Sequence, residues 1–206
     1  KKLIREIALS KTYRLSSARS EQREDPENRL LAHMNHRRLD AEAIRDAMLS
    51  VSGALNLEMG GATFPANLEK DVDFQFEAPR RSVYVPVFRS SLPELFEVFD
   101  FANTSLVTGR RTLSTVAPQA LFMMNHPFVR TQAKLTAERL LGDSQPNEAQ
   151  RIDHAYLRIL GRHATAKEIS LSQEFLKSVA TEKNQVEAWT QMVQSLFSTI
   201  DFRYVR

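Results

Sequence analysis

Apolar side chains in residues 147–206 recur every three or four positions, which is the spacing of one face of an α-helix. The first of these runs ends at Gly161, and glycine readily adopts the left-handed conformation that terminates helices. The pattern Thr165-x-x-Glu168 then has the spacing of a capping box, which stabilises a helix start by about 1 kcal/mol. A third run covers residues 185–199. The sequence therefore predicts a C-terminal part made of three helices.

Helical spacing, with proline and glycine at the element ends, predicts further helices in the rest of the chain. They are expected at about residues 2–10, 26–34, 40–53, 93–99, 118–124 and 127–141. In the third of these, Asp40 is expected to cap the first turn and Gly53 to close the last one. The exposed face of the same helix is expected to carry Glu42, Arg45 and Asp46.

The middle of the chain lacks this periodicity. Residues 54–80 form the longest non-helical stretch and contain paired glycines and two prolines. Residues 82–88 are β-branched and aromatic, but Pro86 cannot donate to a ladder, so we expect an edge strand or an extended segment. Residues 71–77 alternate polar and apolar and could pair with it. The predicted fold class is mainly α: a multi-helix domain with long irregular central loops and at most a small two-stranded β element, between residues 70 and 90.

Composition narrows the possible functions. The 28 basic and 25 acidic residues are interleaved, so we expect no nucleic-acid partner, which would require a basic stripe. The chain has no cysteine, which excludes disulfides, thiolate nucleophiles and iron–sulfur ligation within it. We expect no cofactor. No run of 18 apolar residues occurs, so no membrane span is expected in this segment.

The length of 206 residues permits a single helical domain over residues 1–206. Helical spacing begins immediately at Lys1, without a capping residue before it. We therefore expect the chain to be a piece of a longer protein.

Several motifs together resemble a known family. They are Thr12-Tyr-Arg14-Leu-Ser-Ser17, Asn28-Arg-Leu-Leu31, Arg37-Arg38-Leu39-Asp40-Ala-Glu42-Ala-Ile-Arg45-Asp46, Arg81-Ser-Val-Tyr84, Phe99-Asp100-Phe-Ala, Gly109-Arg110-Arg111-x-x-x-Thr115-Val-x-Pro118-Gln119-Ala-Leu, Met124-Asn125-x-Pro127-Phe128-Val129 and Leu196-Phe197-Ser-x-x-x-Phe202-x-Tyr204-Val205. The set runs along nearly the whole chain and resembles domain of unknown function 1553, the C-terminal domain of planctomycete-type exported, cytochrome-associated proteins.

The resemblance implies a location and a domain arrangement, but no reaction. Members usually carry this domain after another domain of unknown function, and often after a cytochrome-c-like domain, on a chain with an export signal. It therefore implies a periplasmic or extracytoplasmic location. It also implies partners among upstream domains of the same chain, with a c-type cytochrome domain as one candidate. No activity is carried over.

The clearest candidate site is the segment Gly109-Arg110-Arg111 with its neighbouring hydroxyl groups. Guanidinium forks and hydroxyls suit a carboxylate, sulfate or phosphate. The alternative, which we favour, is an interior arginine network that pairs with Asp100, Glu97 or Glu94. The candidate ligand-binding set is Arg81, Asp100, Arg110, Arg111, Thr115 and Gln119. No catalytic residue and no metal ligand is assigned.

Other patterns fit ordinary structural roles better. His33 and His36 could begin a metal site but lack a third ligand. The alternating oxygen ligands of residues 71–77 lack the glycine of a calcium loop. The aromatic residues between Phe64 and Phe88 could stack on a sugar, although packing within the protein is the simpler reading.

Two functions remain open. The first is a non-catalytic interaction or scaffold module of an exported multidomain envelope protein. The second is the binding or hydrolysis of an anionic glycan or envelope polymer through an arginine-rich site. Whether the chain is an enzyme is left open.

Overall fold

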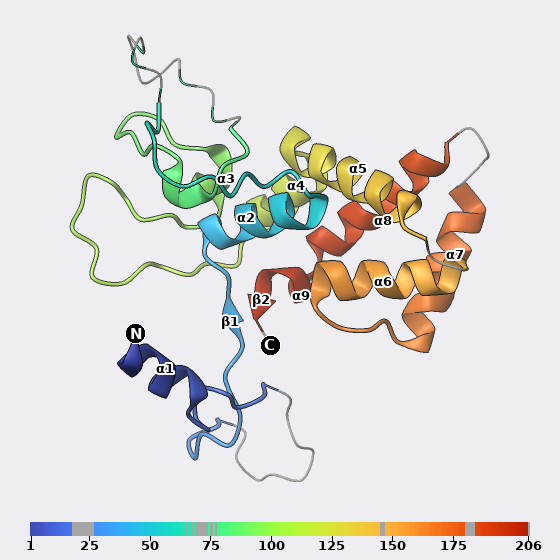
Figure 1. The fold of residues 1–206 in the computed structure, drawn as a ribbon, viewed down its shortest axis with the longest axis horizontal. Coiled ribbons are helices and arrows are strands. Elements are labelled where there is room, and N and C mark those ends of the chain that lie inside the picture. Colours follow the sequence, from blue (N-terminus) through green and yellow to red (C-terminus); the bar gives the residue numbers. More distant parts are fainter. Residues whose placement is uncertain are drawn as a thin grey trace. The chain divides into compact units, whose positions relative to one another are not determined.

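A computed structural model describes residues 1–17, 27–64, 66, 68, 74, 76, 78–144, 147–179 and 184–205, and helices dominate this part of the chain (Figure 1). The helices are α1 (Lys2–Leu9), α2 (Ala41–Ser52), α3 (Glu94–Val98), α4 (Ala117–Asn125), α5 (Pro127–Gly142), α6 (Glu148–Leu160), α7 (Ala166–Val179), α8 (Gln185–Ser198) and α9 (Ile200–Arg203). Two short strands, β1 (Arg37–Arg38) and β2 (Tyr204–Val205), complete the regular structure. The fold class is mainly α, as predicted.

The chain divides into two compact units. The first comprises Lys1–Arg38 together with β2, and the second comprises Leu39–Arg203. Helices α6, α7 and α8 of the second unit supply the three C-terminal helices that periodicity predicted. The expected single domain over residues 1–206 stays a prediction. Within the described residues, no helix has the length and apolar character needed to cross a membrane.

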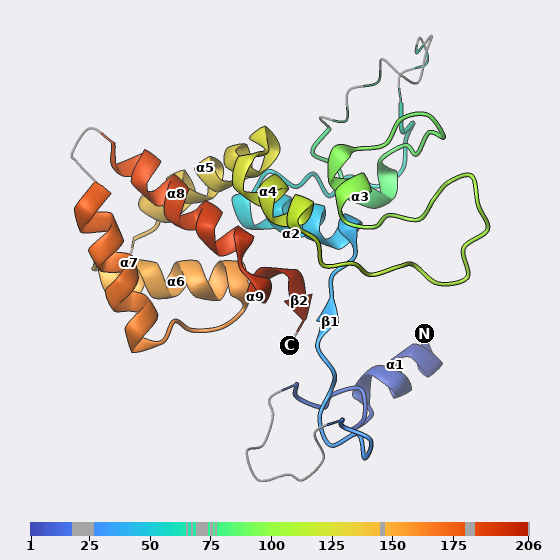
Figure 2. The same ribbon diagram turned by 180° about the vertical axis from the view of Figure 1, so that it is seen from behind.

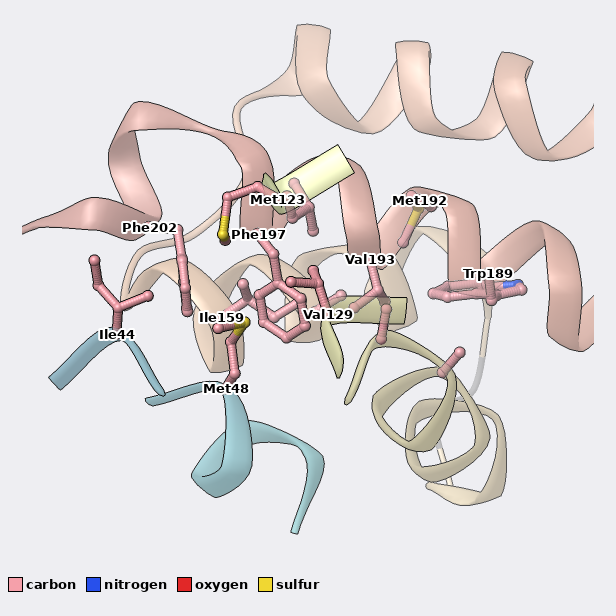
Figure 3. Close-up of a cluster of buried hydrophobic side chains, with 14 of the residues drawn as sticks. Ile44, Met48, Met123, Val129, Ile159, Trp189, Met192, Val193, Phe197 and Phe202 are labelled. Atoms are coloured by element: carbon pink, nitrogen blue, oxygen red, sulfur yellow. The ribbon is translucent and has the colours of Figure 1, made fainter. Parts of the chain in front are cut away.

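The core of the second unit is built around α5 and α8, which lie side by side in both ribbon views (Figures 1 and 2). On α5, Val129, Ala133 and Ala137 follow one another every four residues and are fully buried, because this spacing keeps them on one helix face. Figure 3 shows side chains from several helices converging on this core, with Phe197 and Trp189 of α8 among the largest. Burying one large apolar side chain in this core stabilises the fold by about 1.5–3 kcal/mol.

The structure confirms several helix ends that capping residues and glycines in the sequence predicted. Gly53 and Gly161 follow α2 and α6 with φ of 81° and 68°, the left-handed conformation that glycine adopts without steric cost. In the capping box, Glu168 Oε2 accepts hydrogen bonds from the amide and hydroxyl of Thr165, and Thr165 Oγ1 accepts one from the Glu168 amide. Asp40 does precede α2, but the predicted capping bond is wrong, because its side chain makes no cap hydrogen bond.

The predicted helix at residues 26–34 is also wrong over its described part. Asn28 has a φ of 50°, which leaves the helical conformation, and its buried side chain organises a loop instead. Its Oδ1 accepts hydrogen bonds from the amides of Ala32 and His33, while its Nδ2 donates to the carbonyl of His33 and to Asn35 Oδ1. An asparagine side chain that bonds nearby backbone competes with helix formation.

The small β element lies elsewhere than predicted. Antiparallel strands β1 and β2 pair Arg37 with Val205 and Arg38 with Tyr204, so the sheet joins segments far apart in the sequence. Ser82–Tyr84, which we expected to be extended, forms a 3-10 turn. Most of the expected partner segment, residues 71–77, lies outside the described residues.

Candidate functional site

The second unit contains a cavity of about 570 Å³ bordered by α2, α3, α4 and α5. Its apolar walls include Leu49, Phe76, Leu95, Phe122, Pro127 and Phe128. Small-molecule sites are typically concave, mostly apolar and between about 300 and 1,000 Å³. The cavity therefore has the size and lining of a ligand site, and the polar groups that reach it decide its chemistry.

His126 stands at the break between α4 and α5. Proline at the next position disfavours a helical conformation at His126, which ends α4 there and starts α5 at Pro127. The ring stacks on Phe122 with centroids 4.2 Å apart. Nδ1 accepts a hydrogen bond from the amide of Phe128 at 3.1 Å, so this geometry puts the ring proton on Nε2. Nε2 in turn lies 3.1 Å from Glu94 Oε2, and donates to that carboxylate at the mouth of the cavity.

Arg45 reaches the cavity from α2 and is 95% buried, with a side-chain exposure of 5%. Its Nη1 donates to the carbonyl of Arg80 and to Ser82 Oγ, and its Nη2 donates to the carbonyl of Ala78. Asp46 Oδ1 lies 3.7 Å from Nη1. Burial lowers the pKa of Arg45, and the charge of Asp46 offsets part of this effect. Arg45 thus fastens the segment around residues 78–82 to α2.

Gln132 of α5 is a second buried polar group that lines the cavity, with an exposure of 5%. The hydroxyl of Ser52 donates to Gln132 Oε1 at 2.7 Å, and it also lies 3.0 Å from the carbonyl of Leu49. Within the described residues, the amide nitrogen of Gln132 has no hydrogen-bond partner. One end of the carboxamide is therefore held and the other is left for a ligand.

The segment Gly109-Arg110-Arg111 is the candidate site that the sequence indicated, and its contacts differ from those of the cavity residues. Arg111 forms two hydrogen bonds to Glu42, with Nη1 at 2.7 Å from Oε2 and Nη2 at 2.8 Å from Oε1. The guanidinium also lies over the ring of Phe101. Burial alone would raise the pKa of Glu42, but the hydrogen bond and charge of Arg111, together with a backbone hydrogen bond at Glu42, lower it. Arg111 thus pairs with a carboxylate of α2, and the predicted partners Asp100, Glu97 and Glu94 were wrong for it.

Asp100 and Gln119 are brought together by Ser114. Asp100, with a φ of 60°, accepts hydrogen bonds from the amide and hydroxyl of Ser114, each at 2.8 Å. The buried Gln119 Nε2 donates to the carbonyls of Val98 and Ser114. These contacts close the base of the loop that carries the arginine segment. They give Asp100 and Gln119 a structural role.

The other candidate residues are exposed. Arg81, Arg110 and Thr115 all present their side chains to solvent. In the described part of the chain, no hydrogen bond or ion pair connects any of them to the Asp100–Gln119 pair. The candidate set therefore divides into the Asp100–Gln119 pair, Arg111 paired with Glu42, and three exposed positions. Arg110 is the guanidinium of the segment that stays accessible.

The remaining patterns have these outcomes. Phe64, Phe74 and Phe76 pack against Phe88 with ring centroids 5.5 to 6.3 Å apart, in tilted or edge-to-face geometry. Phe74 and Phe76 also pack edge to face, 4.9 Å apart. No group of three or more metal-ligating side chains occurs among the described residues. His33 and His36 lie in a non-helical segment. The acidic members of residues 71–77 lie outside the described residues.

Sequence reasoning missed the cavity. The expected exposure of Arg45 was wrong, because the segment around residues 78–82 covers it and supplies its hydrogen-bond acceptors. The signal for His126 was present, since the Asn125-His126-Pro127 break predicts an imidazole at a helix start. No signal in the sequence connects Gln132 with Ser52, which is 80 residues away.

Comparison with known proteins identifies one family. The family PSD1, described as a protein of unknown function (DUF1553), matches residues 1–176. No curated protein and no solved structure matches the chain.

Proposed function

The chain belongs to the DUF1553 family, and we propose that it is a non-catalytic interaction module of an exported multidomain envelope protein. In this proposal it holds a neighbouring domain of the same polypeptide through the apolar face of α1. The exported setting, and a c-type cytochrome domain as one candidate neighbour, follow from the resemblance. The interaction role is supported by a physical feature of the first unit.

That feature is the lack of any buried side chain on α1. Leu3, Ile4 and Ile7 lie along one stripe of the helix, and all are exposed, Ile4 by 71%. Leu9, the last residue of the helix, is exposed as well. An apolar stripe of this kind normally packs against another surface, since leaving it in water forgoes about 1.5–3 kcal/mol per side chain.

The length of α1 adds to the argument. It has eight residues, whereas isolated helices shorter than about 12–15 residues are marginal in water. Its N-cap, Lys1, makes no side-chain capping bond, and its last turn has no basic residue to stabilise it. Tertiary packing must therefore supply most of its stability, and a partner surface is the natural source.

The charged residues in and beside α1 indicate the chemistry of that partner surface. The first fourteen residues carry five basic side chains in or beside α1 and a single acid, Glu6; the basic residues are Lys1, Lys2, Arg5, Lys11 and Arg14. A groove with an apolar floor and an acidic rim would complement both features. The proposed partner is accordingly a protein domain with an acidic-rimmed apolar groove.

The absence of cysteine allows a direct test. Ile4→Cys places a thiol on the apolar stripe of α1, and Lys134→Cys places one at an exposed position of α5. Alkylation by N-ethylmaleimide, followed by mass spectrometry of the labelled peptide, should be about tenfold slower at position 4 in the natural full-length polypeptide than in residues 1–206. Position 134 should react equally in both, and Ile7→Cys should repeat the result for position 4.

Two results would contradict the proposal. Equal reactivity of position 4 in both proteins would show that α1 is not covered. Protection that appears only on adding phosphatidylglycerol vesicles would assign the face to a lipid surface, since basic amphipathic helices also bind anionic membranes.

Binding or hydrolysis of an anionic glycan or envelope polymer is a second candidate, and the exposed guanidinium of Arg110 favours it. Heparin and polygalacturonate should then raise the melting temperature, and Arg110→Ala should abolish the rise. Arg89→Ala, at another exposed arginine, is the matched control. No rise with either polymer, or an equal rise in both variants, would remove this candidate.

A further inference from the structure

We infer that the cavity between α2, α3, α4 and α5 binds an uncharged, mainly aromatic small molecule that carries a carbonyl or hydroxyl group. This site is independent of the apolar face of α1, because its residues come from the second unit alone.

The walls define the body of the ligand. Phe76, Phe122 and Phe128 contribute aromatic surface, and Leu49 and Leu95 contribute aliphatic surface. A volume of about 570 Å³ admits a molecule of several fused rings. Ring faces and edges in such walls favour a flat aromatic molecule, which can stack or pack edge to face.

The carboxamide of Gln132 determines which polar group the ligand should carry. It is 95% buried, is held at one end by Ser52, and lines the cavity. Its Nε2 is therefore free to donate a hydrogen bond into the cavity. A ligand carbonyl or hydroxyl would accept this bond and fix the orientation of the rings.

The charges exclude an ionic ligand. Arg45 is bonded to backbone carbonyls and lies 3.7 Å from Asp46, so its charge is already compensated within the protein. Glu94, with a side-chain exposure of 64%, presents a carboxylate at the mouth, which repels anions. A cation would lose its hydration against mainly apolar walls, and the Glu94 carboxylate beside it already accepts a hydrogen bond from His126. An uncharged molecule avoids both penalties.

The site is also preorganised. His126 is fixed by its bond from the Phe128 amide and by stacking on Phe122. Arg45 ties the segment around residues 78–82 to α2. Rigid walls reduce the entropy lost on binding, so a cavity of this kind does not depend on a large rearrangement.

Nile red tests the inference, because it is an uncharged, fused-ring dye with a ring carbonyl. We expect saturable binding with a blue-shifted emission in residues 1–206. Thr131→Trp, at the rim of the cavity, should weaken binding at least about tenfold, and Lys134→Trp, an exposed position one turn further along α5, should not. Gln132→Leu should weaken binding about fivefold, the loss of one hydrogen bond. Melting temperatures identify any variant that does not fold.

A measurement on the unmodified chain keeps the test independent of the variants. Nile red should shift the methyl NMR signals of Leu49 and Leu95 and leave those of Leu3 and Leu9 unchanged. Shifts confined to Leu3 and Leu9, or loss of binding in Ile4→Glu with retention in Thr131→Trp, would overturn the inference. An anionic dye, 1-anilinonaphthalene-8-sulfonate, that binds the cavity more tightly than Nile red would also overturn it.

Discussion

Replacement of Glu168 by glutamine should destabilise the second unit at neutral pH and much less in acid. Arg162 holds Glu168 through two hydrogen bonds, Nη1 to Oε2 at 2.9 Å and Nη2 to Oε1 at 2.6 Å. The same guanidinium bonds Asp201 Oδ2 through Nη2 and Nε, at 2.7 and 3.1 Å. The cluster thus ties the start of α7 to α9. Glutamine keeps the size and capping geometry of Glu168 and removes its charge.

The lowered pKa of Glu168 gives the size of the expected loss of stability. The bonds from Arg162 lower the pKa from 4.5 to about 2, against the opposing effect of burial. At about 1.4 kcal/mol per pH unit, this fall corresponds to a ceiling of about 3.4 kcal/mol. The side chains of Arg162, Glu168 and Asp201 are about a quarter exposed, so solvent screening reduces the expected loss to about 1–2 kcal/mol.

The pH dependence follows from the direction of this change. Because the folded-state pKa lies below the unfolded value, the stabilisation is complete above pH 4.5 and declines as the pH falls toward 2. Urea denaturation measures the free energy of unfolding of the wild type and of Glu168→Gln. The difference between the two proteins at pH 3 should be roughly half or less of the difference at pH 7. The difference in melting temperature at pH 7 should be about 2–8 °C.

Asn147→Ala, at the N-cap of α6, provides the control, because the side chain of Asn147 accepts its hydrogen bond from the neutral amide of Gln150. Its loss of about 1 kcal/mol should be the same at both pH values. The reasoning is refuted if Glu168→Gln destabilises equally at pH 7 and pH 3, or if it has no effect at pH 7.

Three further predictions concern stability. Phe197→Ala should lower the free energy of unfolding in urea by about 3–5 kcal/mol, because the ring is fully buried; a loss below 1 kcal/mol would contradict this. Gly53→Ala should lower the melting temperature, because residue 53 has a φ of 81° and a new Cβ would lie 2.9 Å from Arg139 Nη1; an unchanged melting temperature would show that the helix end adapts. A double-mutant cycle of Arg111→Ala and Glu42→Ala should give a coupling of about 1 kcal/mol or less, since both side chains are about a third exposed; a coupling above about 3 kcal/mol would indicate a pair shielded from solvent.

The failed predictions share a physical cause. The apolar residues Leu30, Leu31 and Met34 have helical spacing, yet they are exposed, because the side chain of Asn28 offers the backbone a competing set of hydrogen bonds. Arg45 occupies a polar position on α2, yet it is buried, because a loop 35 residues away supplies carbonyl acceptors. In both cases hydrogen bonds made by a polar side chain decided the outcome, and the spacing of apolar residues carries no information about such bonds.

By itself, the sequence determined the helical fold and many helix ends. These features depend on contacts between residues a few positions apart, such as the Thr165–Glu168 box and the glycines after α2 and α6. The tertiary structure alone decided which charges are neutralised and where a ligand can enter. Arg111 meets Glu42 across 69 residues and Gln132 meets Ser52 across 80. Residue spacing carries no information about such pairs, because chain packing creates them.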